Sequence, residues 1–157
     1  MRAILLAAGL CVFAAPTITM APAAASDKTD VLAVVHQYMD GYNKGDVKAE
    51  VATCASPASI IDDFPPHHWQ GATACADWAK AYTGYGKANG IAGGHVALAA
   101  PSQVTVDGNS AYAIFPANYT FTQKGKPQSV PHSVWTVALA KQAAGWRIVG
   151  WTWSDGP

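Results

Sequence analysis

The second half of the chain alternates apolar and polar residues with a period of two, and this alternation restricts the possible folds more than any other feature. A period of two is typical of β-strands with one buried face. The longest runs are residues 110–123, 128–142 and 146–154, and a further run, 95–106, is expected to break at Pro101. Short glycine-containing turns separate the runs, so they predict an antiparallel meander.

The first half has the spacing of helices instead. Three segments show it: residues 30–44, 47–54 and 71–85. Lys44-Gly45 is expected to end the first helix, and Ser56-Pro57 to end the second. Helices followed by a meander predict an α+β fold, with three helices on one face of an antiparallel sheet. Proline and glycine interruptions predict that the sheet curves, and helices inside its bend would leave a conical cavity.

A secretory signal is predicted at the N-terminus. Arg2 precedes a short apolar run, and the small-residue tract 21–25 ends in an Ala-x-Ala pattern. We predict cleavage after Ala25, which makes residues 1–25 a signal peptide and residues 26–157 a single domain. An uncleaved anchor is the alternative, although the apolar run is short for a span. The sequence therefore predicts a secreted or periplasmic protein with no membrane attachment after cleavage.

Two cysteines, Cys54 and Cys75, would remain in the mature chain. Export permits disulfide formation, so we predict that these two pair. A loop of about twenty residues closed in this way contributes roughly 3 kcal/mol to stability. Zinc binding is the rival interpretation, but the pair lacks Cys-x-x-Cys spacing.

Charge argues against nucleic acid as a partner. Removing Arg2 from ten basic residues leaves nine, against ten acids, and Arg147 is then the only arginine. No glycine-rich phosphate loop and no supported nucleophile motif is present, so we predict no cofactor.

Residues 59–71 concentrate more chemically able groups than any other stretch, and begin with a short β-branched run that predicts a strand. Asp62 and Asp63 are adjacent, so in extended backbone they would point to opposite faces, one toward a cavity and one toward water. Both being solvated is the alternative. His67 and His68 could ligate a metal, but adjacent histidines in a loop rarely converge on one ion. We predict no metal site, and a loop over a pocket mouth anchored by Trp69.

This order of elements resembles the nuclear transport factor 2-like superfamily, in its SnoaL-like and ketosteroid-isomerase-like branches. The resemblance is carried by residues 42–46 closing the first helix, the strand 59–62, the predicted turn 69–71 and the ending 145–149. It covers nearly all of residues 30–154, and the order of the motifs is more specific than any one of them.

The resemblance implies a cone-shaped pocket floored by the sheet. In ketosteroid isomerases an acid after the first strand moves the proton, while a first-helix tyrosine and a protonated second aspartate stabilise the oxyanion. On this resemblance Asp62 corresponds to the base and Tyr38 to the tyrosine. Residues 128–142 contain no acid, so the second aspartate has no counterpart. His132 is a candidate to replace it, or simply a hydrogen-bonded strand histidine. The other predicted pocket residues are Asp63, Phe64, His67, Trp78, Tyr119 and Trp135.

Two classes of function stay open. The first is a protein that binds a small apolar or aromatic molecule in the pocket. The second is a cofactor-free isomerase, lyase or hydratase that uses Asp62 as general base and Tyr38 as oxyanion donor. The expected partner is a small-molecule ligand, with a homodimer possible because a curved sheet often offers one exposed face.

Overall fold

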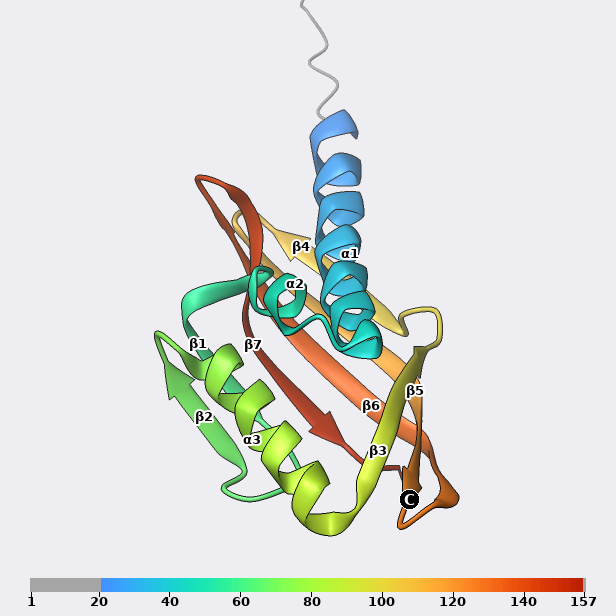
Figure 1. The fold of residues 1–157 in the computed structure, drawn as a ribbon. Coiled ribbons are helices and arrows are strands. Elements are labelled where there is room, and N and C mark those ends of the chain that lie inside the picture. Colours follow the sequence, from blue (N-terminus) through green and yellow to red (C-terminus); the bar gives the residue numbers. More distant parts are fainter. Residues whose placement is uncertain (1–20, 157) are drawn as a thin grey trace, which may run out of the picture.

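The computed structural model describes residues 21–156, which form three helices and seven strands. The helices are α1 (Ala21–Lys44), α2 (Val47–Val51) and α3 (Ala74–Asn89). The strands are β1 (Cys54–Ile61), β2 (His68–Gly71), β3 (Ile91–Leu98), β4 (Gln103–Asp107), β5 (Ser110–Gln123), β6 (Lys126–Gln142) and β7 (Gly145–Ser154). They build one sheet in the order β2-β1-β7-β6-β5-β3, with β4 also on β5 (Figure 1). Within residues 21–156 only β1 and β7 pair in parallel, so the predicted α+β fold with an antiparallel-dominated sheet is confirmed.

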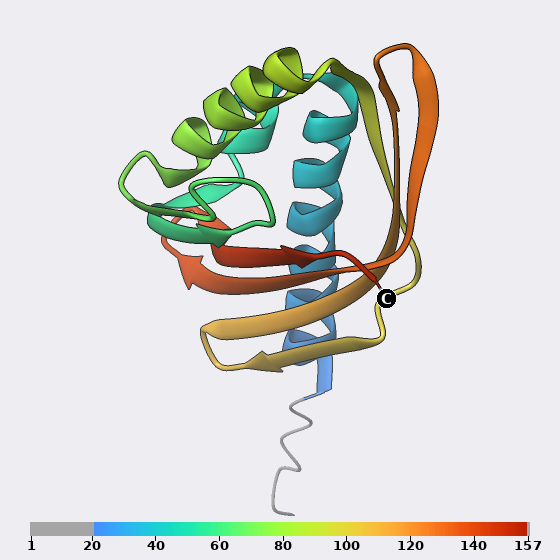
Figure 2. The same ribbon diagram turned by 90° about the horizontal axis from the view of Figure 1, so that it is seen from below.

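The sheet curves around the helices. Figure 2 shows α1 and α3 in the bend, with β3 and the far end of the β5–β6 hairpin turning up beside them. The β5–β6 register shifts between Ala117 and Tyr119, and the facing His132 has a φ of 61°. A bulge of this kind bends a strand and reverses its facing pattern beyond it. The predicted curvature thus comes from an irregularity in the two longest strands.

The core lies between α1 and the sheet. On α1, Val31, Val35 and Tyr38 are almost fully buried. They face the inward parity of β5 and β6, where Phe115 and Trp135 are equally buried. Burial of each large apolar side chain stabilises the fold by about 1.5–3 kcal/mol.

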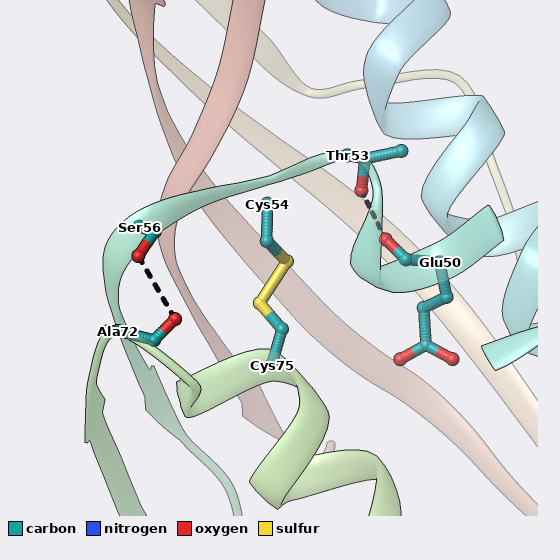
Figure 3. Close-up of a disulfide and its surroundings, with 6 residues drawn as sticks. All are labelled: Glu50, Thr53, Cys54, Ser56, Ala72 and Cys75. Carbon is teal, nitrogen blue, oxygen red and sulfur yellow. Dashed lines mark hydrogen bonds between the residues drawn. A yellow bond between two sulfur atoms is a disulfide. The ribbon is translucent and has the colours of Figure 1, made fainter. Parts of the chain in front are cut away.

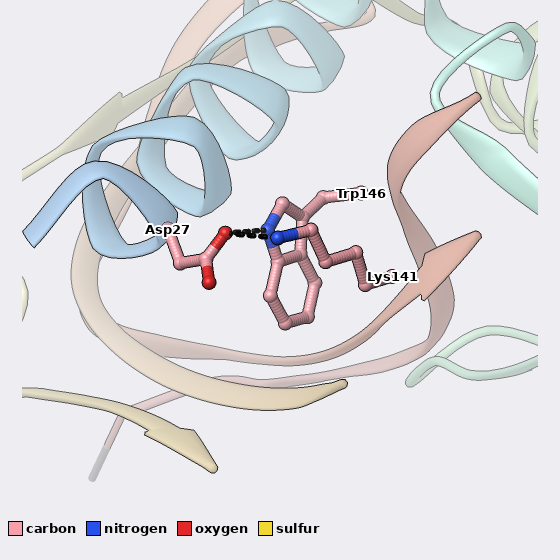
Figure 4. Close-up of polar contacts among 3 residues, drawn as sticks. All are labelled: Asp27, Lys141 and Trp146. Carbon is pink, nitrogen blue, oxygen red and sulfur yellow. Dashed lines mark hydrogen bonds and ion pairs between the residues drawn. The ribbon is translucent and has the colours of Figure 1, made fainter. Parts of the chain in front are cut away.

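The start of α1 is tied to the β6–β7 hairpin (Figure 4). The Lys141 ammonium donates to Asp27 Oδ1 at 2.6 Å, and the Trp146 indole N–H donates to the same oxygen at 3.3 Å. The hydrogen bond from Lys141 is the main reason that the pKa of Asp27 is lowered. These contacts fix the angle at which α1 crosses the sheet.

The predicted signal peptide lies mostly outside the described residues. Because α1 begins at Ala21, cleavage after Ala25 would remove its first five residues and leave Asp27 in place. No helix within residues 21–156 is long and apolar enough to cross a membrane.

Two predictions around β1 were wrong. The second helix ends at Val51 rather than at Cys54, and Ser56-Pro57 does not break the chain but lies inside β1, joined by a cis peptide bond. Proline is tolerated because pairing with β7 skips from Cys54 to Ser59, so no ladder hydrogen bond requires its missing N–H.

The elements that follow also differ from expectation. Residues 69–71, predicted as a turn, belong to β2 and pair antiparallel with β1. The third helix starts at Ala74 and continues through Gly84 and Gly86 to Asn89, and Gly90 with a φ of 70° ends it. Gly86 is buried, and an ideal Cβ there would make ordinary van der Waals contact with the Ile91 carbonyl at 3.4 Å. The predicted strand 95–106 is two strands, divided around Pro101.

Candidate functional site

A cavity of about 250 Å³ lies between α1, α3 and the curved sheet. Eleven of its nineteen lining residues are aromatic, so its walls are mostly apolar rings. The aromatic residues are Tyr38, Tyr42, Phe64, Trp78, Tyr82, Tyr85, Tyr119, Phe121, Trp135, Trp151 and Trp153. The others are Met39, Asp62, Asp63, Ile91, Val96, Gln123, Val130 and Asp155.

We call Tyr38, Trp135 and Trp151 the floor of the cavity, because all three are at least 95% buried. Their rings contact one another, with the Tyr38 and Trp135 centroids 5.3 Å apart. The Tyr38 hydroxyl and the Trp151 indole nitrogen make no well-formed hydrogen bond among the described residues, although the hydroxyl lies close to Trp151 and to Glu50. The floor therefore carries two buried polar groups without a well-formed hydrogen bond.

Behind the floor lies Glu50, a buried carboxyl on α2 that the sequence analysis missed. It is 2% exposed, and its Oε1 also has no hydrogen-bond partner among residues 21–156. Burial raises its pKa to about 7, although the nearby Tyr38 hydroxyl acts in the opposite direction. Gly41 allows this position, because an added Cβ there would lie 2.7 Å from the Glu50 backbone nitrogen. One sequence signal existed: Glu50 interrupts the apolar face of the predicted second helix.

Asp62 lies just beyond the end of β1 and is 8% exposed. Its Oδ2 accepts a hydrogen bond from the Trp78 indole at 2.7 Å, and its Oδ1 accepts one from the Asp63 backbone N–H at 2.8 Å. Burial nevertheless raises its pKa to about 7. The carboxyl is thus oriented on two sides while remaining able to exchange a proton near neutrality.

The exposed lining residues Asp63, Tyr85, Gln123 and Asp155 form what we call the rim. Burial and the negative charge of Asp155 raise the pKa of Asp63, so these two carboxyls lie close enough to interact. The Trp153 indole donates to Asp155 at 3.0 Å and orients it. The expectation that Asp62 and Asp63 face opposite sides was wrong in one respect. Asp62 is the buried one, but both line the cavity because the strand ends at Ile61.

Three phenols meet on the wall beside β3. Tyr42 donates to Tyr82 at 2.7 Å, and the Tyr82 and Tyr119 hydroxyls lie 2.5 Å apart. An ideal Cβ on Gly94 would lie within 3.0 Å of all three hydroxyl oxygens, so only glycine leaves room for them. Burial raises the pKa of Tyr42 and Tyr119 well above the ordinary value, so both remain neutral hydrogen-bonding groups.

The fold agrees with the comparisons to known proteins. The SnoaL-like domain model matches residues 31–155. The chain belongs to the SnoaL-like domain family. The resemblance stated from the sequence is therefore confirmed.

Solved structures show the same fold. This SnoaL-like chain is similar to a nuclear transport factor 2-like superfamily protein from Salmonella enterica serovar Typhimurium, with a TM-score of 0.72 and 23% identity over 86% of this chain and 94% of that one. It is also similar to a ketosteroid isomerase-like protein from Erwinia carotovora atroseptica, with a TM-score of 0.67 and 17% identity over 83% of this chain and 98% of that one. A nuclear transport factor 2-like protein from Novosphingobium aromaticivorans has a TM-score of 0.68 and 20% identity over 84% of this chain and 83% of that one. No curated protein matches the chain.

The SnoaL-like cavity brings together most of the residues named from the sequence. Tyr38, Asp62, Asp63, Phe64, Trp78, Tyr119 and Trp135 line it, whereas His67 and His132 do not. His67 lies in the turn after Pro65-Pro66, with Nδ1 3.2 Å from the Asp62 carbonyl oxygen. His132 sits in the β6 bulge, where strand alternation fails.

Tyr38 and Asp62 do not hydrogen-bond each other. Asp62 bonds to Trp78 and Asp63, and Tyr38 faces Glu50 and Trp151 instead. Sequence reasoning also omitted Tyr42, Tyr82 and Asp155, which only the closing of the fold brings to the cavity.

The predicted disulfide is present between Cys54 and Cys75 (Figure 3). It joins the start of β1 to the start of α3, and so closes the loop that carries Asp62. Ser56 supports the same junction with a hydrogen bond to the Ala72 carbonyl. Within the described part of the chain, no three histidine, cysteine or acidic side chains are placed to hold a metal ion.

Proposed function

We propose that this protein is an exported SnoaL-like binding protein whose cavity takes a small aromatic or apolar molecule. The observation that carries the proposal is the aromatic lining of the cavity, eleven of nineteen residues. Aromatic walls with a few placed polar groups are typical of ligand pockets. An apolar cavity of about 150 Å³ holds benzene. The larger volume here, about 250 Å³, would suit a single ring with a short substituent.

A second candidate is supported by Asp62 and Tyr38. Asp62 has a pKa of about 7 at the cavity wall, and the Tyr38 hydroxyl on the floor has no partner. A base near neutrality and a free phenol donor are what a cofactor-free isomerase, lyase or hydratase requires. In this alternative Asp62 removes a proton next to a carbonyl, and Tyr38 donates to the developing oxyanion.

Native mass spectrometry of the protein purified from the periplasmic fraction would test ligand binding directly. A retained small aromatic molecule is expected. To separate binding from catalysis, we would assay enones and β-hydroxycarbonyl compounds with the native protein, Asp62→Asn and Asp63→Asn. Turnover lost only in Asp62→Asn would establish the catalytic alternative. Ligand retention without turnover in any of the three proteins would favour binding.

Export remains part of the proposal. The N-terminal pattern supports it, and the Cys54–Cys75 disulfide is consistent with an oxidising compartment. N-terminal sequencing of the exported product should begin at Ser26, and a product that retains Met1 would contradict cleavage.

A further inference from the structure

The charged side chains that line the cavity are all acidic. Its charged lining residues are three carboxyl groups, Asp62, Asp63 and Asp155. Among the described residues, no lysine, arginine or histidine lines it. An anionic ligand would therefore enter an acidic site with no countercharge, at a cost that grows as water is excluded. A cationic ligand would instead be attracted by these carboxyl groups.

The aromatic rings nearest these acids favour a cation as well. Trp78 and Tyr82 stack on α3, and Phe64 meets Tyr82 edge to face. Across the opening, Tyr119 meets Trp153 edge to face. The face of an aromatic ring is negative, so rings around a space attract an ammonium group, and tryptophan does so most strongly. The aromatic rings and the carboxylates here both favour the binding of a cation.

The carboxyl groups are held in position before any ligand arrives. Trp78 orients Asp62 at 2.7 Å, and Trp153 orients Asp155 at 3.0 Å. Asp63 and Asp155 repel each other across the rim. An ammonium ion between them would replace this repulsion with two attractive contacts.

An independent observation at the floor points to a ligand inside. Tyr38 and Trp151 are 2% and 5% exposed, and their O–H and N–H make no well-formed hydrogen bond within residues 21–156, although Tyr38 lies close to Trp151 and Glu50. Both groups can donate, so the inner end of the cavity suits a hydrogen-bond acceptor. The rim of the cavity thus favours a cationic group and the floor favours a hydrogen-bond acceptor, and one ligand could carry both.

We propose that the cavity is selective for a small aromatic ammonium ion, with the ammonium at Asp63 and Asp155 and an acceptor oxygen at Tyr38 and Trp151. The proposal rests on the proposed binding function and specifies the class of ligand. The ring lies between the aromatic side chains of α3 and those of β5 and β7.

Three probes of one shape test the charge preference. Tyramine, tyrosol and 4-hydroxyphenylacetate share a phenol and differ in carrying an ammonium, a hydroxyl or a carboxylate. Isothermal titration calorimetry at neutral pH should give tyramine the highest affinity, about tenfold above tyrosol, and 4-hydroxyphenylacetate the lowest. Phenethylamine, which lacks the phenol oxygen, should bind several-fold more weakly than tyramine.

Matched variants locate the effect. The double variant Asp63→Asn/Asp155→Asn removes charge but little volume, and should bring tyramine to within about threefold of tyrosol. Asp40→Asn, an exposed acid on α1 outside the cavity, is the control and should keep the full preference.

Each result decides the proposal. Equal binding of tyramine and tyrosol by the native protein, or tightest binding of the carboxylate, overturns the cation preference and leaves the binding function standing. A tyramine preference that survives in the double variant overturns the role of the rim acids. If none of the probes binds, both the cation preference and the proposed function for small aromatic molecules fail.

Discussion

Asp62 and Glu50 are both buried carboxyls with a pKa raised to about 7 by burial, yet their surroundings differ. Asp62 accepts hydrogen bonds on both oxygens and lines the cavity. Glu50 lies behind the floor, and its Oε1 accepts none from the described residues. The surroundings of Asp62 partly support a carboxylate, whereas those of Glu50 suit a neutral acid. The two carboxyls therefore have similar pKa values but different roles, because only Asp62 lines the cavity and can contact a ligand.

The largest expected effect is at Glu50. Its pKa is 4.5 ordinarily and about 7 in the folded protein, so the folded state binds more protons between these values. The free energy of unfolding should therefore fall as pH rises from 4.5 to about 7, by about 3 kcal/mol from this group. Glu50→Gln should remove that loss. Urea unfolding at pH 4.5 and about pH 8 should show the variant more stable than native protein only at the higher pH. Equal pH slopes would show that Glu50 is not desolvated.

Asp62→Asn should give a smaller gain at about pH 8. It also removes a buried charge, but an amide has one acceptor oxygen where the carboxylate had two. One of the Trp78 and Asp63 N–H groups would then face an NH₂ group. The pKa of Asp62 is raised from 3.8, against 4.5 for Glu50, but the unpaired N–H costs about 2 kcal/mol, so we expect the gain to be about 1 kcal/mol smaller than for Glu50→Gln. The same urea series measures it, and a gain larger than that of Glu50→Gln would mean that the two hydrogen bonds contribute nothing.

Tyr38→Phe tests the contact between the floor and Glu50. The hydroxyl makes no well-formed hydrogen bond among the described residues, so its removal should change the free energy of unfolding by less than about 1 kcal/mol at pH 4.5, where Glu50 is largely neutral. The hydroxyl lies close enough to Glu50 to lower its pKa, so in Tyr38→Phe the upper end of the pH range over which stability falls should move above about 7. A shift of this pH range to lower values would show that the Tyr38 hydroxyl does not lower the pKa of Glu50. Unfolding measured at several pH values, with Glu50→Gln/Tyr38→Phe as control, distinguishes these results.

Asp63→Asn should have the smallest effect on stability, less than about 0.5 kcal/mol, because Asp63 is exposed. The negative charge of Asp63 contributes to the raised pKa of Asp62, so the substitution should lower that pKa. Carboxyl-carbon NMR titration would detect the change. An unchanged Asp62 titration would show that the two acids do not interact.

The sequence predicted the parts of the fold that follow a single period. Alternation over 110–123 and 128–142 gave the two longest strands nearly to the residue. It failed at His132, because a bulge is a local irregularity that the alternation does not reveal. It also failed at Pro57, because whether a strand tolerates proline depends on a distant partner, here β7.

The site was predictable where one element determined it. Asp62 follows directly from the end of a strand, and its inward position was implied by the resemblance to ketosteroid isomerases. Glu50 was missed because its burial depends on the approach of α2 to Gly41. The Tyr42–Tyr82–Tyr119 cluster requires three elements to meet over Gly94. Contacts of this kind depend on tertiary packing rather than on local pattern.

The position of β7 has a consequence for the order in which the chain can fold. In the sheet β7 lies between β1 and β6, so β1 and β2 have no connection to the rest of the sheet until it arrives. Residues 62–144 separate β1 from this parallel partner, and such long-range pairing forms slowly. A ribosome or a translocation channel releasing the chain from its N-terminus would deliver β1 and both cysteines long before their place in the sheet exists. The sheet of such a nascent chain cannot be completed before β7 emerges, so the chain remains without its full tertiary structure until its last strand has been released.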